Sequence, residues 1–127
     1  MALHAGLTGT ASLVVGEEHL AIAVRSGDVP VFATPMIVAL CEEATVAAVA
    51  DHLEPGETTV GVRVELDHRA PSIEGATVTA VAVLDTVDER SLHFSVEAHD
   101  GDTLVARGAV RRVVVDRDRF VGRLGIS

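Results

Sequence analysis

One apolar helix constrains the fold of this chain more than any other feature of the sequence. Between Pro35 and Asp51 the larger apolar residues fall almost all the way round a helical projection, at positions 36, 37, 38, 40, 41, 46 and 49. This pattern is typical of a helix that protein surrounds. Thr34 and Pro35 predict its start, because threonine can cap free N–H groups and proline lacks the donor that would be orphaned there. We therefore expect a helix that begins at Pro35, with Thr34 as its N-cap.

Two carboxylates, Glu42 and Glu43, interrupt this apolar helix near its middle. A carboxylate near a core or an interface is costly unless it is paired or used in chemistry. We therefore expect at least one of them to have a partner or a function. Cys41 beside them is the only cysteine of the chain. It excludes an internal disulfide and fits a buried structural thiol in a reducing compartment.

The charge of the chain limits its partners. A formal net charge of −9 argues against general nucleic-acid binding, which depends on clustered cations. All ten basic residues are arginines, and six of them lie late in the chain, at positions 107, 111, 112, 117, 119 and 123. They either form a solvated surface or include residues that grip a phosphorylated ligand, for which the planar guanidinium is suited.

Length and motifs predict a single domain over residues 1–127. The N-terminus has no basic region, and no charge-free apolar run approaches the length of a membrane span, so we expect a cytoplasmic protein without a membrane anchor. The six histidines show no metal-ligand spacing, and we predict no metal site.

Strand patterns follow the helix, which Pro55 and Gly56 end. From residue 58 to residue 67 the sequence alternates, which predicts one apolar face made of Val60, Val62, Val64 and Leu66. His68 continues that face. Its imidazole is therefore expected to point toward the core and the helix, provided that the strand reaches it without a bulge.

Further strands are predicted over residues 8–15, 76–85, 91–99 and 103–115, with a tight hairpin turn at Asp100-Gly101 and an irregular segment over 17–30. One buried helix against an antiparallel sheet makes a two-layer α+β fold. A flat sheet covers only one side of a helix. Either a curled sheet or a second subunit must therefore cover the remaining sides.

Four segments resemble the hot-dog-fold thioesterases related to fluoroacetyl-CoA thioesterase. They are VFATPMIVALCE at 31–42, LEPGE at 53–57, DHRAP at 67–71 and AHDG at 98–101. The resemblance covers most of the chain and implies a hot-dog fold, in which a five-stranded antiparallel sheet wraps one long central helix. It also implies a catalytic trio, which falls on Thr34, Glu42 and His68.

Each member of this trio also has a purely structural interpretation. Thr34 suits a helix cap, Glu42 suits a contact with an arginine, and His68 suits a hydrogen-bonded place in the core. Glu43 competes with Glu42 for the catalytic place, and the register of the motif favours Glu42. The functional interpretation depends on all three residues occurring together.

The resemblance implies that the chain hydrolyses an acyl-CoA thioester to a free acid and CoA, with no cofactor apart from the CoA of the substrate. Glu42 is then either the general base for water or the attacking group. Thr34 either orients the carbonyl or acts as the nucleophile. His68 transfers protons near neutral pH.

Six residues are predicted to bind the substrate: Phe32, Pro35, Met36, Ile37, Arg111 and Arg112. Free N–H groups at the helix start are candidate oxyanion donors, and the two arginines are candidates for the phosphates of CoA. The fluoroacetate-specific relatives are similar in the core but carry an aromatic lid before the helix. Residues 23–30 of this chain contain no aromatic residue, so we expect a short- or medium-chain acyl group rather than selectivity for fluoroacetyl-CoA.

Helix geometry and the resemblance to hot-dog proteins together predict that two chains build the site. Eight residues separate Thr34 from Glu42 by about 12 Å along the helix and by roughly 80° around it. Two short side chains so placed do not reach the same thioester carbon. Hot-dog proteins form dimers with sites between subunits, so we expect a homodimer that can pair into a dimer of dimers.

Two other hot-dog functions compete with hydrolysis. A non-catalytic module would bind an acyl-CoA or a small carboxylate without turning it over. A dehydratase would need a histidine-containing hydration motif on or before the central helix, and the helix has no histidine before His52. The binding module is therefore the main alternative.

Overall fold

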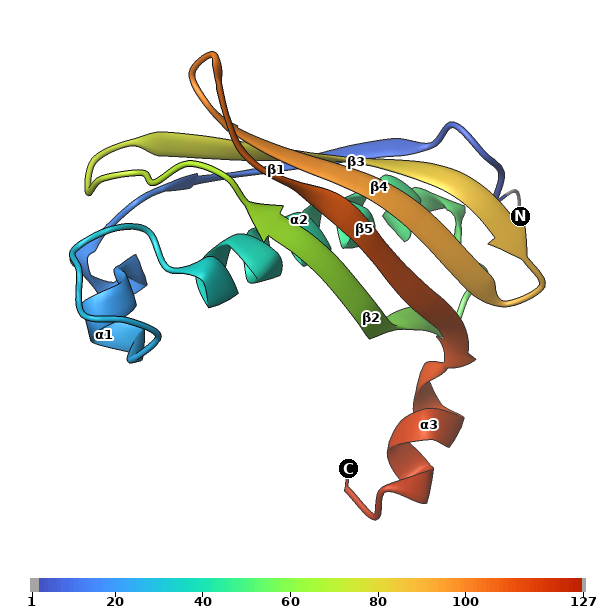
Figure 1. The fold of residues 1–127 in the computed structure, drawn as a ribbon. Helices are drawn as coiled ribbons and strands as arrows, with labels where there is room; N and C mark the ends of the chain where they lie inside the picture. Colours follow the sequence, from blue (N-terminus) through green and yellow to red (C-terminus); the bar gives the residue numbers. More distant parts are fainter. Residues whose placement is uncertain (1–2, 127) are drawn as a thin grey trace.

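The computed structural model describes residues 3–126 and shows one long helix in the hollow of a curved sheet (Figure 1). The helix α2 spans Thr34–Val49. The antiparallel sheet has the strand order β1-β3-β4-β5-β2. Its strands are β1 (Thr8–Val14), β2 (Glu57–His68), β3 (Thr77–Asp88), β4 (Ser91–Asp100) and β5 (Thr103–Asp116). The predicted α+β architecture of one long helix and five antiparallel strands is confirmed.

Short helices lie outside these two layers. They are η1 (Glu17–His19), α1 (Ala21–Val24), η2 (Ala50–His52) and α3 (Arg117–Arg123). The first two lie in the segment that the sequence analysis treats as irregular, and α3 extends from the end of β5 away from the sheet (Figure 1). Among residues 3–126, no helix is long and apolar enough to cross a membrane.

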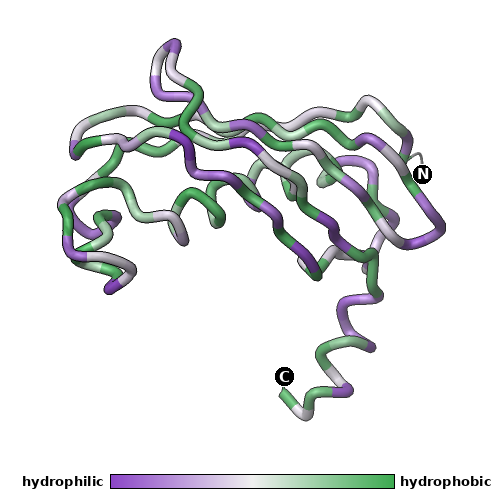
Figure 2. Tube along the Cα trace, in the orientation of Figure 1, coloured by the Kyte–Doolittle hydropathy of each residue, from purple (hydrophilic) through white to green (hydrophobic). Residues whose placement is uncertain are grey.

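The core lies between α2 and the inner face of the sheet. Hydrophilic and hydrophobic residues alternate along the strands, as expected for a sheet with one buried face (Figure 2). The buried residues of α2 are Ile37, Leu40, Cys41, Ala44, Thr45, Ala48 and Val49. The helix packs mainly on β1 and β3 and makes few contacts with β2 and β5. The inner face of β2 and β5 therefore has little helix against it within one chain.

The expectation that protein surrounds α2 is wrong for a single chain. Its far side is exposed at Pro35, Ala39, Val46 and Ala47, and 44% of Val46 is accessible to solvent. The sheet curls over one side of the helix only. An apolar helix face of this kind is typical of a surface that another protein surface covers.

The helix begins one residue earlier than predicted. Ala33 is the N-cap, with extended backbone angles of φ −72° and ψ 138° and no side-chain capping bond. Its carbonyl accepts hydrogen bonds from the N–H groups of Met36 and Ile37, at 3.0 and 3.1 Å. The prediction of Thr34 as the N-cap is therefore wrong. A backbone carbonyl already serves the first turn, and the Thr34 hydroxyl has another partner.

A bulge in β2 changes which side chains face the helix. The pairing of β2 with β5 shifts between Gly61 and Arg63, which leaves Val62 as the extra residue. Thr59 and Gly61 face α2 before the bulge, and His68 faces it afterwards. The predicted continuous apolar face is therefore wrong at Val60 and Val62, and Val62 is 52% exposed. The prediction that His68 points toward the helix is confirmed.

Replacing Gly9 with alanine should destabilise the fold, because the backbone of α2 lies directly against Gly9 of β1. A β-carbon at Gly9 would overlap with Ala44 O and Ala48 N and lie 2.7 Å from Ala48 Cα, all of them helix backbone. Overpacking of this kind costs about 1–3 kcal/mol, which we expect as lost free energy of unfolding in urea. Gly122→Ala is the control, since a β-carbon there meets nothing within 4 Å. Equal stability of the two variants would contradict this packing argument.

Candidate active site

A threonine and a histidine from different elements meet at the start of α2. Thr34 is the first residue of the helix, and His68 is the last residue of β2. The Thr34 hydroxyl lies 2.7 Å from His68 Nδ1. When His68 carries its proton on Nε2, Nδ1 is an acceptor and the hydroxyl donates to it. A hydroxyl bonded to an imidazole nitrogen in this way is the arrangement of an activated nucleophile.

The other side of the imidazole lacks a partner. His68 Nε2 and Ser72 Oγ are both buried, and within residues 3–126 neither forms a hydrogen bond. The Ser72 carbonyl accepts from the Phe32 N–H at 2.8 Å, which places Ser72 close to the start of α2. Nearly all buried polar groups in proteins are hydrogen-bonded. Water, a substrate or a second chain is therefore needed to complete this end of the helix.

The first turn of α2 offers fewer free donors than predicted. The N–H groups of Met36 and Ile37 both donate to Ala33 O, and Pro35 has no N–H. The Thr34 N–H forms no hydrogen bond with any described residue. It lies at the positive end of the helix dipole and beside the Thr34 hydroxyl. The candidate oxyanion donor is therefore Thr34, and the prediction of free N–H groups at Met36 and Ile37 is wrong.

Glu42 belongs to a second polar cluster further along the helix. Its Oε2 accepts from Arg112 Nη1 at 3.1 Å. Arg112 also donates from Nε to Thr59 Oγ1 at 2.9 Å and from Nη2 to Thr59 O at 3.3 Å. Only 8% of Arg112 is exposed, whereas the Glu42 side chain retains 34% exposure. The carboxylate can therefore meet a ligand while a buried guanidinium holds one of its oxygens.

Gly61 makes room for this carboxylate. A β-carbon at Gly61 would overlap with Glu42 Oε2 and lie 3.3 Å from Arg112 Nη1. The sequence analysis missed Gly61 and Thr59 as site residues. A glycine within a strand often marks a close approach of another group, so the signal for Gly61 was present. No comparable signal marked Thr59.

The two clusters are separate within one chain. The structure brings Thr34 and His68 together, but no hydrogen bond among residues 3–126 joins Glu42 to either of them. Glu43, the competing carboxylate, is exposed. Chemistry that uses all three residues of the trio therefore needs either a substrate that spans the clusters or a second chain.

The predicted substrate-binding residues occupy different environments. Phe32 and Ile37 are fully buried, and the Phe32 ring contacts the His19 ring edge-on. Pro35 is exposed, and Met36 is half-buried. Arg111 is exposed, on the face of β5 opposite to Arg112. Within one chain, Arg111 and Arg112 therefore do not meet the same phosphate.

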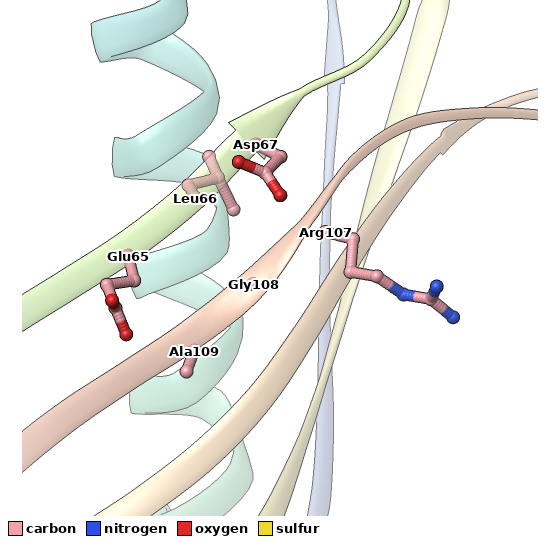
Figure 3. A pocket seen from close by; sticks show the side chains of 6 residues that line it. All are labelled: Glu65, Leu66, Asp67, Arg107, Gly108 and Ala109. Carbon is pink, nitrogen blue, oxygen red and sulfur yellow. The ribbon is translucent and has the colours of Figure 1, made fainter.

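A larger hollow on the outer face of the sheet is not part of this site. It has a volume of about 530 Å³ and lies over β2 and β5, where Glu65, Asp67 and Arg107 line it. Figure 3 shows α2 behind the strands that carry these side chains. A smaller hollow of about 170 Å³ is lined by His68, Arg69, Ala70 and Pro71, and it adjoins the Thr34–His68 pair. In the described part of the chain, no group of three or more potential ligands could hold a metal ion.

Comparisons with known proteins identify the family. The family described as FlK, fluoroacetyl-CoA-specific thioesterase, matches residues 15–118. This chain belongs to that family. It is 41% identical over 90 residues to the fluoroacetyl-CoA thioesterase of Streptantibioticus cattleyicolor. That match covers 71% of this chain and 65% of the relative, which is just under two thirds of its length.

Solved structures support the same family and fold. The structure of the fluoroacetyl-CoA thioesterase FlK superposes with a TM-score of 0.91 at 32% identity, covering 98% of this chain and 96% of that one. A hot-dog-like protein from Thermanaerovibrio acidaminovorans gives a TM-score of 0.85 at 24% identity, covering 94% and 89% of the two chains. The family and the hot-dog fold inferred from the sequence are both confirmed.

Alkaline pH should destabilise the protein through Cys41, which lies beside Glu42. Burial raises the pKa of the Cys41 thiol from 9.0 to about 11, because the apolar surroundings disfavour the thiolate. The folded state therefore holds this proton more tightly than the unfolded state. Its contribution to stability is full below pH 9.0 and is lost as the pH rises toward about 11.

Urea unfolding across this pH range tests the prediction, and the chain suits the test because it contains neither lysine nor tyrosine. The free energy of unfolding should fall with pH in the wild type and much less in Cys41→Ala. The same slope in both proteins would show that another group causes the fall.

Proposed function

We propose that this chain hydrolyses the thioester of a short- or medium-chain acyl-CoA to a free acid and CoA. The hydrogen bond between Thr34 and His68 at the start of α2 carries the proposal. Membership of the thioesterase family and the relative named for fluoroacetyl-CoA hydrolysis support it. The reaction needs no cofactor besides the CoA of the substrate. We further propose that the protein is cytoplasmic and that residues 1–127 form a single domain.

The chemistry begins at Thr34. His68 Nδ1 takes the hydroxyl proton while Oγ1 attacks the thioester carbon, and the Thr34 N–H stabilises the oxyanion that forms. His68 then carries the positive charge and gives its proton to the departing CoA sulfur. This leaves an acyl-threonine ester, which water must hydrolyse. The buried Nε2 of His68 has no hydrogen-bond partner among the described residues, and a water or a polar group of the substrate would supply one.

Glu42 acts as the general base for that water. Arg112 holds Oε2 at 3.1 Å, and Oε1 accepts no hydrogen bond from a described residue. One oxygen therefore fixes the carboxylate, and the other is available to a water molecule. Because the two clusters are separate along α2, we infer that the Glu42 of this base belongs to a partner chain, whose helix would bring its carboxylate toward Thr34 and His68.

The active form is a homodimer that can pair into a dimer of dimers. β2 is an edge strand of twelve residues with unpaired backbone groups along its free side, and such edges are normally covered. The exposed face of α2 and the uncovered inner face of β2 and β5 adjoin it. A two-fold axis beside β2 would join the sheets and bring both helices together.

Release of free thiol from a panel of acyl-CoAs tests the activity and the trio. We expect hydrolysis of a short- or medium-chain substrate, without a large preference for fluoroacetyl-CoA over acetyl-CoA. Thr34→Ala, Glu42→Gln and His68→Ala should each lower kcat/KM at least tenfold, or about 1.4 kcal/mol of transition-state stabilisation. Glu43→Gln is the matched control and should retain wild-type activity.

Three results would contradict parts of this proposal. Binding of acyl-CoA without hydrolysis would favour the non-catalytic binding module. Trio variants as active as the wild type would show that the chain hydrolyses acyl-CoA but that these three residues do not carry the reaction. Fluoroacetyl-CoA hydrolysed orders of magnitude faster than acetyl-CoA would overturn the expected substrate range.

Disrupting the β2 edge should abolish activity without unfolding the chain. Val62→Asp places a charge on the exposed bulge, where the two-fold partner would lie. We expect a folded monomer by analytical ultracentrifugation, with thiol release near background. Val14→Asp is the control, because Val14 is 61% exposed and lies on β1, the edge strand opposite to β2 in the sheet order. A verified monomer with full activity would contradict the two-chain site.

A further inference from the structure

The guanidinium of Arg112 is the most buried charge in the described part of the chain. A buried cation is costly unless its donors are satisfied, and its position is then set by the groups that satisfy them. Two of its three hydrogen bonds go to one residue, Thr59, and the third goes to Glu42. Thr59 thus determines which way the third donor points.

Thr59 holds Arg112 at two points. Its hydroxyl accepts from Nε at 2.9 Å, and its carbonyl accepts from Nη2 at 3.3 Å. Because the guanidinium is a rigid planar fork, fixing Nε and Nη2 also fixes the direction of Nη1. Nη1 then lies 3.1 Å from Glu42 Oε2. A side chain without an oxygen at position 59 would remove the acceptor of Nε and leave only the backbone carbonyl of residue 59 and Glu42 to hold the guanidinium.

The bulge at Val62 places Thr59 in this position. In the ladder, Thr59 pairs with Val114, and Gly61 pairs with Arg112 itself. Without the extra residue, the alternation that carries His68 toward α2 would turn Thr59 away from it. The neighbouring Thr58 pairs with Val115 and faces the outer side of the sheet. The two threonines thus have the same chemistry on opposite faces of β2.

We propose that Thr59 is a positioning residue of the active site, which orients Arg112 so that its Nη1 holds the Glu42 carboxylate for catalysis. The proposal rests on the thioesterase function proposed above. Thr59 touches no reacting atom and acts through Arg112 and Glu42. Its loss should therefore reduce kcat more than it changes KM.

Steady-state kinetics of three variants test the consequence for catalysis. Thr59→Val keeps the shape of the side chain and removes the hydroxyl, and we expect kcat to fall about tenfold with KM changed by less than about threefold. Thr59→Ser restores the acceptor and should recover most of kcat. Thr58→Val is the matched control and should match the wild type. A Thr59→Val variant with wild-type kcat would overturn the proposal.

A double-mutant cycle separates positioning from a general loss of stability. In the Glu42→Gln background, Thr59→Val should lower kcat by less than about twofold, because the group that it positions is already lost. An unchanged tenfold effect in that background would mean that Thr59 does not act through Glu42, and it would overturn the proposal.

The Arg112 Nε–H resonance provides a readout that is independent of activity. In a nitrogen-15 labelled protein it is assigned by its loss in Arg112→Lys. We expect slow exchange with solvent in the wild type and in Thr58→Val, and faster exchange with a shifted resonance in Thr59→Val. Unchanged exchange in Thr59→Val would overturn the proposal. If the wild type hydrolyses no acyl-CoA, the proposed function fails, and this resonance still decides whether Thr59 holds Arg112.

Discussion

Burial of the Arg112 guanidinium is the constraint on which the polar half of this structure depends. Only 8% of Arg112 is exposed, and its guanidinium donates to three acceptors. Those acceptors come from two elements, since Thr59 lies on β2 and Glu42 on α2. The ion pair of Arg112 with Glu42 depends on three features. They are the bulge in β2, the missing side chain at Gly61 and the carboxylate in an apolar helix.

The backbone at the start of α2 determines whether the Thr34 hydroxyl is available for chemistry. Its first turn is capped by the Ala33 carbonyl, which leaves the Thr34 hydroxyl available for His68. If Thr34 capped the helix through its side chain, the same oxygen would accept hydrogen bonds from backbone N–H groups. The local backbone at Ala33 therefore makes the hydroxyl chemically useful. The helix dipole adds a positive potential where an oxyanion would form.

In a single chain, two surfaces and one polar atom lack the contacts that buried groups normally have. One face of α2 is exposed, the inner face of β2 and β5 has little helix against it, and His68 Nε2 lies buried without a partner among the described residues. All three lie toward the β2 side of the molecule. A second copy placed there would cover apolar surface and bring a second Glu42 toward the Thr34–His68 pair, so assembly and catalysis would depend on the same surface.

The sequence by itself determined the long apolar helix and the five strands, because periodicity and turn residues are local signals. The proposed trio came instead from the resemblance of its motifs to those of a known family. The sequence pattern placed the helix start one residue late and assigned Val60 and Val62 to the wrong face. Only the tertiary structure decided that Thr34 bonds His68 and that Glu42 pairs with Arg112, which is 70 residues away in the chain. A bulge and a buried ion pair depend on contacts between distant segments, and such contacts leave no periodic trace in the sequence.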